Sequence, residues 1–347
     1  ITGLPFSGPV VHRLGPARAV LAASLTVTTG LLPLAAGLQI GIVGLAAVGF
    51  VLIGLGIGIW DVAMNVAGAD VEQRLGRSLM PRLHAAFSLG TVAGAGVGAA
   101  SAAAGVPLAV QVLVVAALVA VAMAVAVRFF LPVHHDAAQK ASGGSGVLAA
   151  WREPRTLLIG LLVLGFAFIE GSANDWIAVA MVDGYGTSEA VGAIGFGLFV
   201  SAMTVGRLIG GSALERFGRV AVLRATAVTT LAGLLVVSLG GSTLLALTGA
   251  ALWGLGASLG FPVGMSAAAD DPARAAARVS VVSSIGYAAF LAGPPLIGLV
   301  AESAGIRRAL LVVLGALALG VLASGASRPL ATPDEEPSTR CDGGRAG

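Results

Sequence analysis

The chain has 347 residues, of which 57% are hydrophobic and only 11% are charged, and its mean hydropathy is +0.96. A soluble domain needs far more charge to cover its surface, so this composition excludes a water-soluble protein. The net charge of +3 is small, and no nucleic-acid partner is expected. The single cysteine, Cys341, excludes an intrachain disulfide.

Ten apolar stretches are long enough to cross a membrane, for which a helix needs about 20 residues. They cover residues 19–38, 41–68, 83–104, 106–131, 157–181, 190–211, 220–239, 242–269, 279–300 and 309–326. Lipid offers no hydrogen bonds to the backbone, so each stretch must be a helix or a barrel strand. Runs of this length without period-two alternation exclude a barrel. The sequence therefore predicts an all-α transmembrane fold in contact with the lipid bilayer.

The connections between these stretches alternate in charge. The basic set holds most of the arginines: Arg13, Arg18, Arg74, Arg77, Arg82, Arg152, Arg155, Arg216, Arg219, Arg274, Arg278 and Arg328, with Arg340 and Arg345 in the tail. By the positive-inside rule this set is cytoplasmic, which predicts a multi-pass protein of the bacterial inner membrane with a cytoplasmic C-terminus. We expect Arg128, Arg207 and Arg224 to lie at helix ends on the same side. Arg307 and Arg308 are exceptions to the rule.

The longest internal connection divides the chain into two halves. Residues 132–156 contain Ser142-Gly143-Gly144-Ser145-Gly146 and read as a flexible cytoplasmic linker between an N-terminal bundle, 1–131, and a C-terminal bundle, 157–327. The pair His134-His135 has no further metal ligands nearby, so neither a metal nor a cofactor is expected. The acidic tail, 328–347, is predicted to be disordered and cytoplasmic.

The two halves resemble each other. Gly3, Gly8, Arg13 and Gly15 have counterparts at Gly206, Gly211, Arg216 and Gly218, at a constant offset of 203 residues. Gly54-Leu55-Gly56 recurs as Gly254-Leu255-Gly256. The matches keep one orientation, so we expect two pseudo-symmetric bundles related by an axis along the membrane normal. On this reasoning each half should hold six helices, and the first half lacks its first helix and most of its second; the chain starts without methionine, which fits a truncated start.

Two loops then resemble the signature motif of the major facilitator superfamily. They read Gly8-x-x-x-His12-Arg13-x-Gly15 and Gly211-x-x-x-Glu215-Arg216-x-Gly218-Arg219. Within that family the fourth and fifth helices are similar to the fucose-permease-like branch, at Asp61, Asn65, Leu83-His84, Phe87 and Gly90-x-x-x-Gly94. The resemblance implies a transporter in which these loop residues gate the passage; the alternative is that their arginines act only as topology signals. His12 replaces the usual aspartate, and the proline-containing motif of drug antiporters is missing from residues 90–98.

Three carboxylates lie inside the predicted spans. An ionisable group in the membrane costs several kcal/mol, so Asp61, Glu170 and Asp175 are candidates for proton coupling. A carboxylate without a partner in an apolar environment readily takes up a proton. The alternative is that each is a fixed hydrogen-bond acceptor between helices.

Other polar and aromatic side chains of the spans are candidates for binding the solute, and Asn65 and Asn174 share helix faces with Asp61 and Glu170, respectively. The candidate substrate-binding residues are Asn65, Asn174, Trp176, Tyr287, Ser284 and Trp60. Tyr287 and Ser284 belong to a polar stripe with Ser280 and Ser283, whose hydroxyls could bind a polar solute or satisfy one another. The tryptophans could stack on a sugar or simply pack.

The sequence thus predicts a secondary active transporter of a small polar solute, sugar-like or an organic acid, working by alternating access with proton coupling and acting as a monomer. An enzyme is not expected, because His-Glu-x-x-His, Gly-x-Ser-x-Gly and phosphate-cradling motifs are all missing from the sequence. Two alternatives stay open: an efflux transporter of the same fold, and a membrane sensor or scaffold that does not transport.

Overall fold

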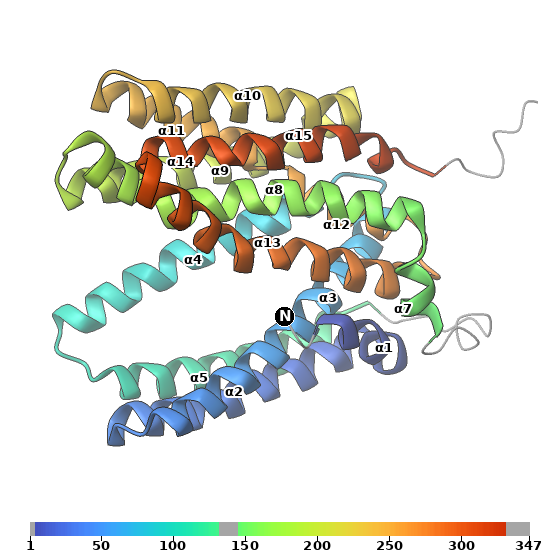
Figure 1. Ribbon diagram of the computed structural model, residues 1–347. Coiled ribbons are helices and arrows are strands. Elements are labelled where there is room, and N and C mark those ends of the chain that lie inside the picture. The colour runs from blue at the N-terminus through green and yellow to red at the C-terminus, as the bar shows by residue number, and fades with distance from the viewer. Residues whose placement is uncertain (1–3, 132–144, 331–347) are drawn as a thin grey trace, which may run out of the picture.

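The computed structural model describes residues 4–131 and 145–330, and the regular secondary structure within them is helical throughout (Figure 1). The first half consists of α1 (Leu4–Leu14), α2 (Pro16–Ile40), α3 (Val43–Leu75), α4 (Met80–Ala103), α5 (Leu108–Ala126) and the 3-10 turn η1 (Val127–Phe129). The second half begins with α7 (Ser145–Ala150), α8 (Pro154–Val179), the π-helical turn η2 (Ala180–Gly184), α9 (Glu189–Phe217) and α10 (Arg219–Leu239). It continues with α11 (Thr243–Ala257), α12 (Gly260–Ala268), α13 (Ala275–Ala304), α14 (Ile306–Ala309), η3 (Leu310–Val312), α15 (Val313–Ala323) and η4 (Ser324–Ser327).

Ten membrane-crossing helices confirm the predicted spans. Within the described residues, ten helical segments are long and apolar enough to cross a bilayer, four in the first half and six in the second. Helix α1, with 11 residues, is too short to cross. The fold is therefore all-α and transmembrane, with two helical bundles. Residues 132–144, which hold most of the predicted linker and its histidine pair, and 331–347 of the predicted tail lie outside the described residues.

The internal repeat is visible in the backbone. Gly15 precedes α2 with φ 76° and ψ 158°, and Gly218 precedes α10 with φ 76° and ψ 161°. This conformation is essentially restricted to glycine. Two glycines at the offset of 203 residues thus make the same turn between two helices, as the two-bundle interpretation predicts.

The bundles lie side by side, and one helix runs between them. Helices α2, α3 and α5 form one side of the molecule and α8 to α15 the other, whereas α4 starts against the second bundle and ends beside α5 (Figure 1). Helix α4 contacts α9 and α12, and α13 contacts α1 and α3. Side chains at the starts of α4 and α13 therefore meet the opposite bundle.

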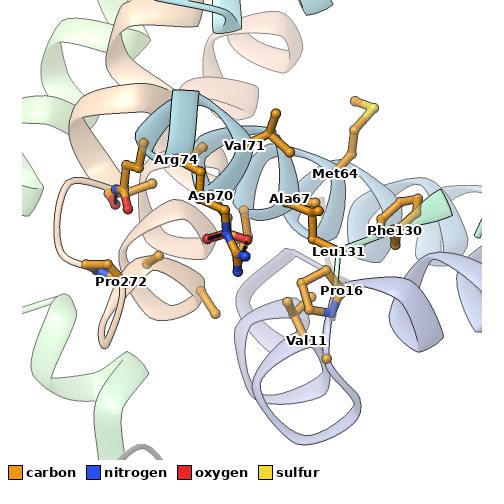
Figure 2. Close-up of a pocket in the computed structure, with 18 of the residues that line it drawn as sticks. Val11, Pro16, Met64, Ala67, Asp70, Val71, Arg74, Phe130, Leu131 and Pro272 are labelled. Atoms are coloured by element: carbon orange, nitrogen blue, oxygen red, sulfur yellow. Dashed lines mark hydrogen bonds and ion pairs between the residues drawn. The ribbon is translucent and has the colours of Figure 1, made fainter. Parts of the chain in front are cut away.

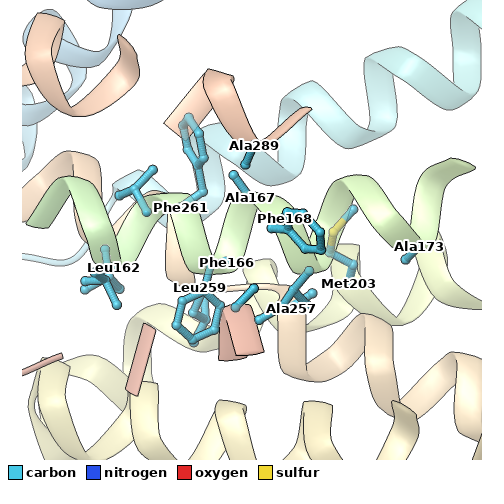
Figure 3. Packing of buried hydrophobic residues seen from close by; sticks show 14 of the residues in the cluster. Leu162, Phe166, Ala167, Phe168, Ala173, Met203, Ala257, Leu259, Phe261 and Ala289 are labelled. Atoms are coloured by element: carbon cyan, nitrogen blue, oxygen red, sulfur yellow. The ribbon is translucent and has the colours of Figure 1, made fainter. Parts of the chain in front are cut away.

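Helix α8 is the central helix of the second bundle. Leu162, Phe166 and Ala167 of this helix are at most 1% exposed, and α8 packs against α12, α13 and α15 (Figure 3). Glycine allows the closest approach: the backbone of Gly260 lies against the ring of Phe166. By contrast, α4 and α5 leave most of their apolar side chains exposed, as expected of surfaces that face lipid.

Arg307, an exception to the charge rule, is held by the second bundle itself. Its Nη2 donates to Gly240 O at 2.6 Å and its Nε to Ser238 O at 3.2 Å, at the end of α10. The guanidinium also stacks on Tyr185, 4.3 Å from the ring centre. A cation that satisfies the last carbonyls of a helix is favourable irrespective of the side of the membrane.

Candidate functional site

Asp61 lies where α3 of the first bundle meets α13 of the second. Asn65, one turn further along α3, donates its Nδ2 to Asp61 Oδ1 at 3.1 Å. From α13, Ser283 Oγ donates to Asp61 Oδ2 at 3.1 Å and the Tyr287 hydroxyl donates to Asp61 Oδ1 at 3.2 Å. Three of the predicted residues, Asp61, Asn65 and Tyr287, thus form one cluster that joins the bundles.

The donors around Asp61 are uncharged. In the part of the chain that the structure describes, Asp61 takes part in no ion pair. A protonated Asp61 could therefore keep hydroxyl and amide neighbours without leaving a cation unpaired.

Glu170 has a different environment, because it is paired with an arginine. Arg207 Nη2 lies 2.9 Å from Glu170 Oε2, and the side chains are 3% and 13% exposed, respectively. The expectation that Arg207 lies at a helix end was wrong: it is buried within α9 and faces α8. An arginine is tolerated there because the carboxylate of Glu170 balances its charge.

Arg207 also contacts the first bundle. Its Nη1 donates to Ser88 Oγ on α4 at 2.6 Å and approaches His84 O at 3.5 Å, while its Nε donates to Ser258 O, between α11 and α12, at 3.2 Å. A single guanidinium therefore binds groups of α4 on one side and of α8 and the 258–259 connection on the other.

A row of aromatic rings connects the two polar clusters. The ring of His84 lies 5.6 Å from Phe261, Phe261 lies 6.0 Å from Tyr287, and Tyr287 lies 5.8 Å from Phe290. His84 stands four residues before Ser88, and Tyr287 donates to Asp61. The Asp61 and Arg207 clusters thus form two neighbouring parts of one interface between the bundles.

The remaining predicted residues lie outside these clusters. Asn174 and Asp175 are exposed on α8. Ser284 donates to Ser280 O of its own helix at 2.7 Å. Trp176 packs beside Gly298, and its Nε1 has no hydrogen-bond partner among the described residues; Trp60 is half-buried against the core.

The sequence interpretation missed Arg207 and Ser88. Arg207 falls inside the predicted span 190–211, and an ionisable residue within a span is by itself a signal for function. Ser88 carries no comparable signal, since serine is common in membrane helices.

Near the predicted signature loops, hydrogen bonds join the two bundles. We call this end of the helices the basic end, because it carries Arg155, Arg219 and Arg278. Glu215 of α9 accepts a hydrogen bond from Ser78 N at 3.0 Å, just before α4. Glu72 of α3 accepts from Leu79 N at 2.7 Å and Met80 N at 2.8 Å, and it also binds Ser266 of α12.

Other contacts at the basic end lie between the bundles or within the second bundle. Gln73 donates to Ala269 O at 2.8 Å across the interface. Arg219 binds Asp270 and Ser266, each at 2.8 Å, and Arg155 binds Asp270 at 2.8 Å. The loop arginines differ from one another: Arg216 stacks on Phe217, and Arg13 is exposed.

The glycines of the loops allow the close approach. A side chain at Gly8 would meet Ala276 O and Ser280 Cβ, both at 3.1 Å, and one at Gly211 would meet Ser78 O at 2.9 Å. Gly15 and Gly218 make the turns already described. All four glycines therefore serve either a turn or a contact between the bundles.

A large cavity opens at the same end but is separate from the Asp61 cluster. Its volume is about 1140 Å³, and it lies between α1, α3, η1 and the loop around Pro272 (Figure 2). Its charged lining residues include Arg13 and the ion pair of Asp70 and Arg74, whose charged atoms lie 3.0 Å apart. Asp61, Glu170 and Arg207 do not line it.

The structure has ten membrane-spanning helices among its described residues, arranged in two matched bundles, with charged groups buried where the bundles meet. These features define a polytopic membrane transporter. A sequence profile described as the Major Facilitator Superfamily matches residues 171–344. An uncharacterized transporter, y4wD, of Sinorhizobium fredii is 32% identical over 93% of this chain and 84% of its own length. The chain belongs to the major facilitator superfamily and is a transporter, not an enzyme.

Other comparisons agree. An uncharacterized transporter of the same superfamily from Yersinia pestis is 30% identical over 81% of this chain and 71% of its own length. The E. coli fucose:proton symporter FucP has the same fold, with a TM-score of 0.79, 16% identity and coverage of 94% of this chain and 88% of that one. The human organic anion transporter MFSD10 gives a TM-score of 0.75 at 20% identity, covering 92% of this chain and 80% of that one.

Proposed function

We propose that this transporter is a secondary active carrier of a small polar solute, coupled to protons and working by alternating access in the bacterial inner membrane. Asp61 is the proton carrier in this proposal. The observation that supports it is the position of Asp61 between the bundles, with hydroxyl and amide donors from both α3 and α13. Protonation would weaken hydrogen bonds across the interface, so it would change the balance between conformations.

Glu170 is less suited to carry the proton. It is the counterion of Arg207, and neutralising it would leave a buried guanidinium without a partner. We therefore assign Glu170 to holding Arg207 in place. Asp175 is exposed and is not the counterion of Arg207, but it lies outside the two clusters.

The contacts at the basic end serve as the gate on the cytoplasmic side. Glu215 with Ser78 N, Glu72 with Ser266, and Gln73 with Ala269 O each join one bundle to the other. For the solute to reach the cytoplasm these bonds must break together while the bundles rock apart. The fold of the fucose:proton symporter supports a carrier of this kind.

The test begins with the identification of a ligand. Purified protein is screened for thermal stabilisation by sugars, polyols and organic acids, because a ligand that prefers the folded state raises its stability. The ligand that stabilises the protein is then measured in proteoliposomes, both as exchange without a gradient and as accumulation driven by an inward proton gradient.

Asp61→Asn is the informative variant. It should retain solute exchange and lose accumulation, because asparagine can hydrogen-bond but cannot carry a proton. The control is Asp183→Asn, an exposed carboxylate beyond α8, which should accumulate solute like the unmodified protein. Accumulation by Asp61→Asn at the unmodified rate would remove Asp61 from the mechanism. Binding without any exchange would favour a sensor.

A further inference from the structure

Arg207 distributes its hydrogen bonds unequally between the two bundles. Within its own bundle it binds Glu170 on α8 at 2.9 Å and Ser258 O at 3.2 Å. Across the interface, its hydrogen bonds to described residues both go to α4: a short one to Ser88 Oγ at 2.6 Å, and one to His84 O at the limit of 3.5 Å. The anchoring contacts therefore move with Arg207, whereas the contact with Ser88 is shared between bundles.

We propose that Arg207 is a positioning residue for alternating access, and that its hydrogen bond to Ser88 is a latch inside the membrane that breaks and re-forms in each cycle. This inference rests on the proposed transport cycle. Arg207 adds a contact at the helix interior to those of the loops at the basic end. The bonds to Glu170 and Ser258 O fix the guanidinium in an orientation that faces α4. The hydrogen bond to Ser88 can therefore re-form without a change in the conformation of Arg207.

Burial makes this contact strong enough to matter. Both side chains are at most 3% exposed, so water does not compete for the guanidinium. A hydrogen bond to a charged group contributes about 1.5–3 kcal/mol, which corresponds to a change of roughly ten-fold or more in an equilibrium constant. Loss of the Ser88 hydroxyl should therefore shift the balance toward the conformation that is open at the basic end.

A buried cysteine reports that opening without any knowledge of the solute. Ser280 of α13 is 0% exposed, and its Cβ lies against Gly8 of α1 in the other bundle. The reporter protein carries Ser280→Cys together with Cys341→Ser, and it is placed in lipid nanodiscs, where both faces are accessible. The measured quantity is the rate at which a water-soluble maleimide modifies the new cysteine.

Ser88→Ala should raise this rate about ten-fold over the reporter protein. Ser88→Thr keeps the hydroxyl and should restore a slow rate. The matched control is Thr91→Ala on the same helix: this residue is exposed and its hydroxyl donates to Phe87 O of α4 itself, so the rate should not change.

A second variant, at the other partner of the hydrogen bond, tests whether the effect of Ser88→Ala comes from the lost bond and not from misfolding. Arg207→Lys keeps the charge beside Glu170 but cannot reach three partners at once, so it should also speed modification. Equal rates for Ser88→Ala, Thr91→Ala and the reporter protein would overturn the latch. That result would leave proton-driven accumulation untouched, whereas a failure of accumulation with an intact latch effect would count against the proposed function instead.

Discussion

Arg207 and Glu170 form an ion pair between adjacent helices of the second bundle, with Nη2 and Oε2 2.9 Å apart. Each charge compensates the other in surroundings that would not tolerate either alone. The pair gives α8 and α9 a fixed relative position, and it holds a guanidinium against α4 of the other bundle.

Replacing one partner of this ion pair should therefore lower the free energy of unfolding more than replacing both. Glu170→Gln is expected to lower the free energy of unfolding by about 3–5 kcal/mol, because it leaves a buried charge without compensation. The combined variant Glu170→Gln with Arg207→Gln should recover part of this loss. Thermal and denaturant unfolding in detergent measures both, with Glu302→Gln, an exposed carboxylate at the end of α13, as the control. Losses that simply add would contradict the account.

Two glycines of α3 provide a paired test of helix packing. A Cβ at Gly56 would lie 2.8 Å from Ala23 O and 2.6 Å from a methyl of Val27, whereas no atom of the described residues lies within 4 Å of one at Gly54. Gly56→Ala should destabilise the protein by about 1–3 kcal/mol, because α2 and α3 must move apart.

Gly54→Ala should be neutral or slightly stabilising, because alanine is the better helix former by about 1 kcal/mol. The same unfolding assay compares the two variants. Equal effects at both positions would show that α2 does not approach α3 at Gly56.

Glu153, just before α8, should make stability depend on pH. Burial raises the pKa of its carboxyl, but hydrogen bonds from Arg278, Thr156 and Arg274 outweigh burial and hold the pKa below its usual value of 4.5. A carboxylate with a lowered pKa in the folded state stabilises the protein above the unfolded pKa, and this contribution is lost as the pH falls through the folded pKa.

The unmodified protein should thus be more stable than Glu153→Gln at neutral pH. The difference should shrink once the pH falls below about 4.5. Melting temperatures of both proteins between about pH 3 and pH 7 check this. A difference that stays constant across the range would mean that the charge of Glu153 contributes nothing.

Much of the fold could be predicted because the membrane imposes simple rules. The ten spans follow from length and hydropathy, and the matched positions of Gly15 and Gly218 follow from a repeat that is plain in the sequence. The position of Arg307 on the less basic side of the membrane does not follow from these rules. Its partners are the backbone carbonyls of Ser238 and Gly240, at the end of a helix that is distant in the sequence.

Some members of the candidate site can be proposed from the sequence. A carboxylate in an apolar span is a candidate on its own, so the sequence indicates Asp61 and Glu170, and the polar stripe on α13 indicates Tyr287. Whether a carboxylate is paired depends on which helices are neighbours, and a single sequence does not give this. The sequence therefore does not show that Arg207 of α9 lies beside Glu170.

The central claim is that a proton on Asp61 accompanies the solute. It is tested most directly by adding the stabilising solute to proteoliposomes in weakly buffered medium and recording the external pH. The account predicts that the medium becomes alkaline as solute enters, and that Asp61→Asn abolishes this change while solute exchange continues. Solute entry without proton uptake in the unmodified protein, or an unchanged proton signal in Asp61→Asn, would contradict it.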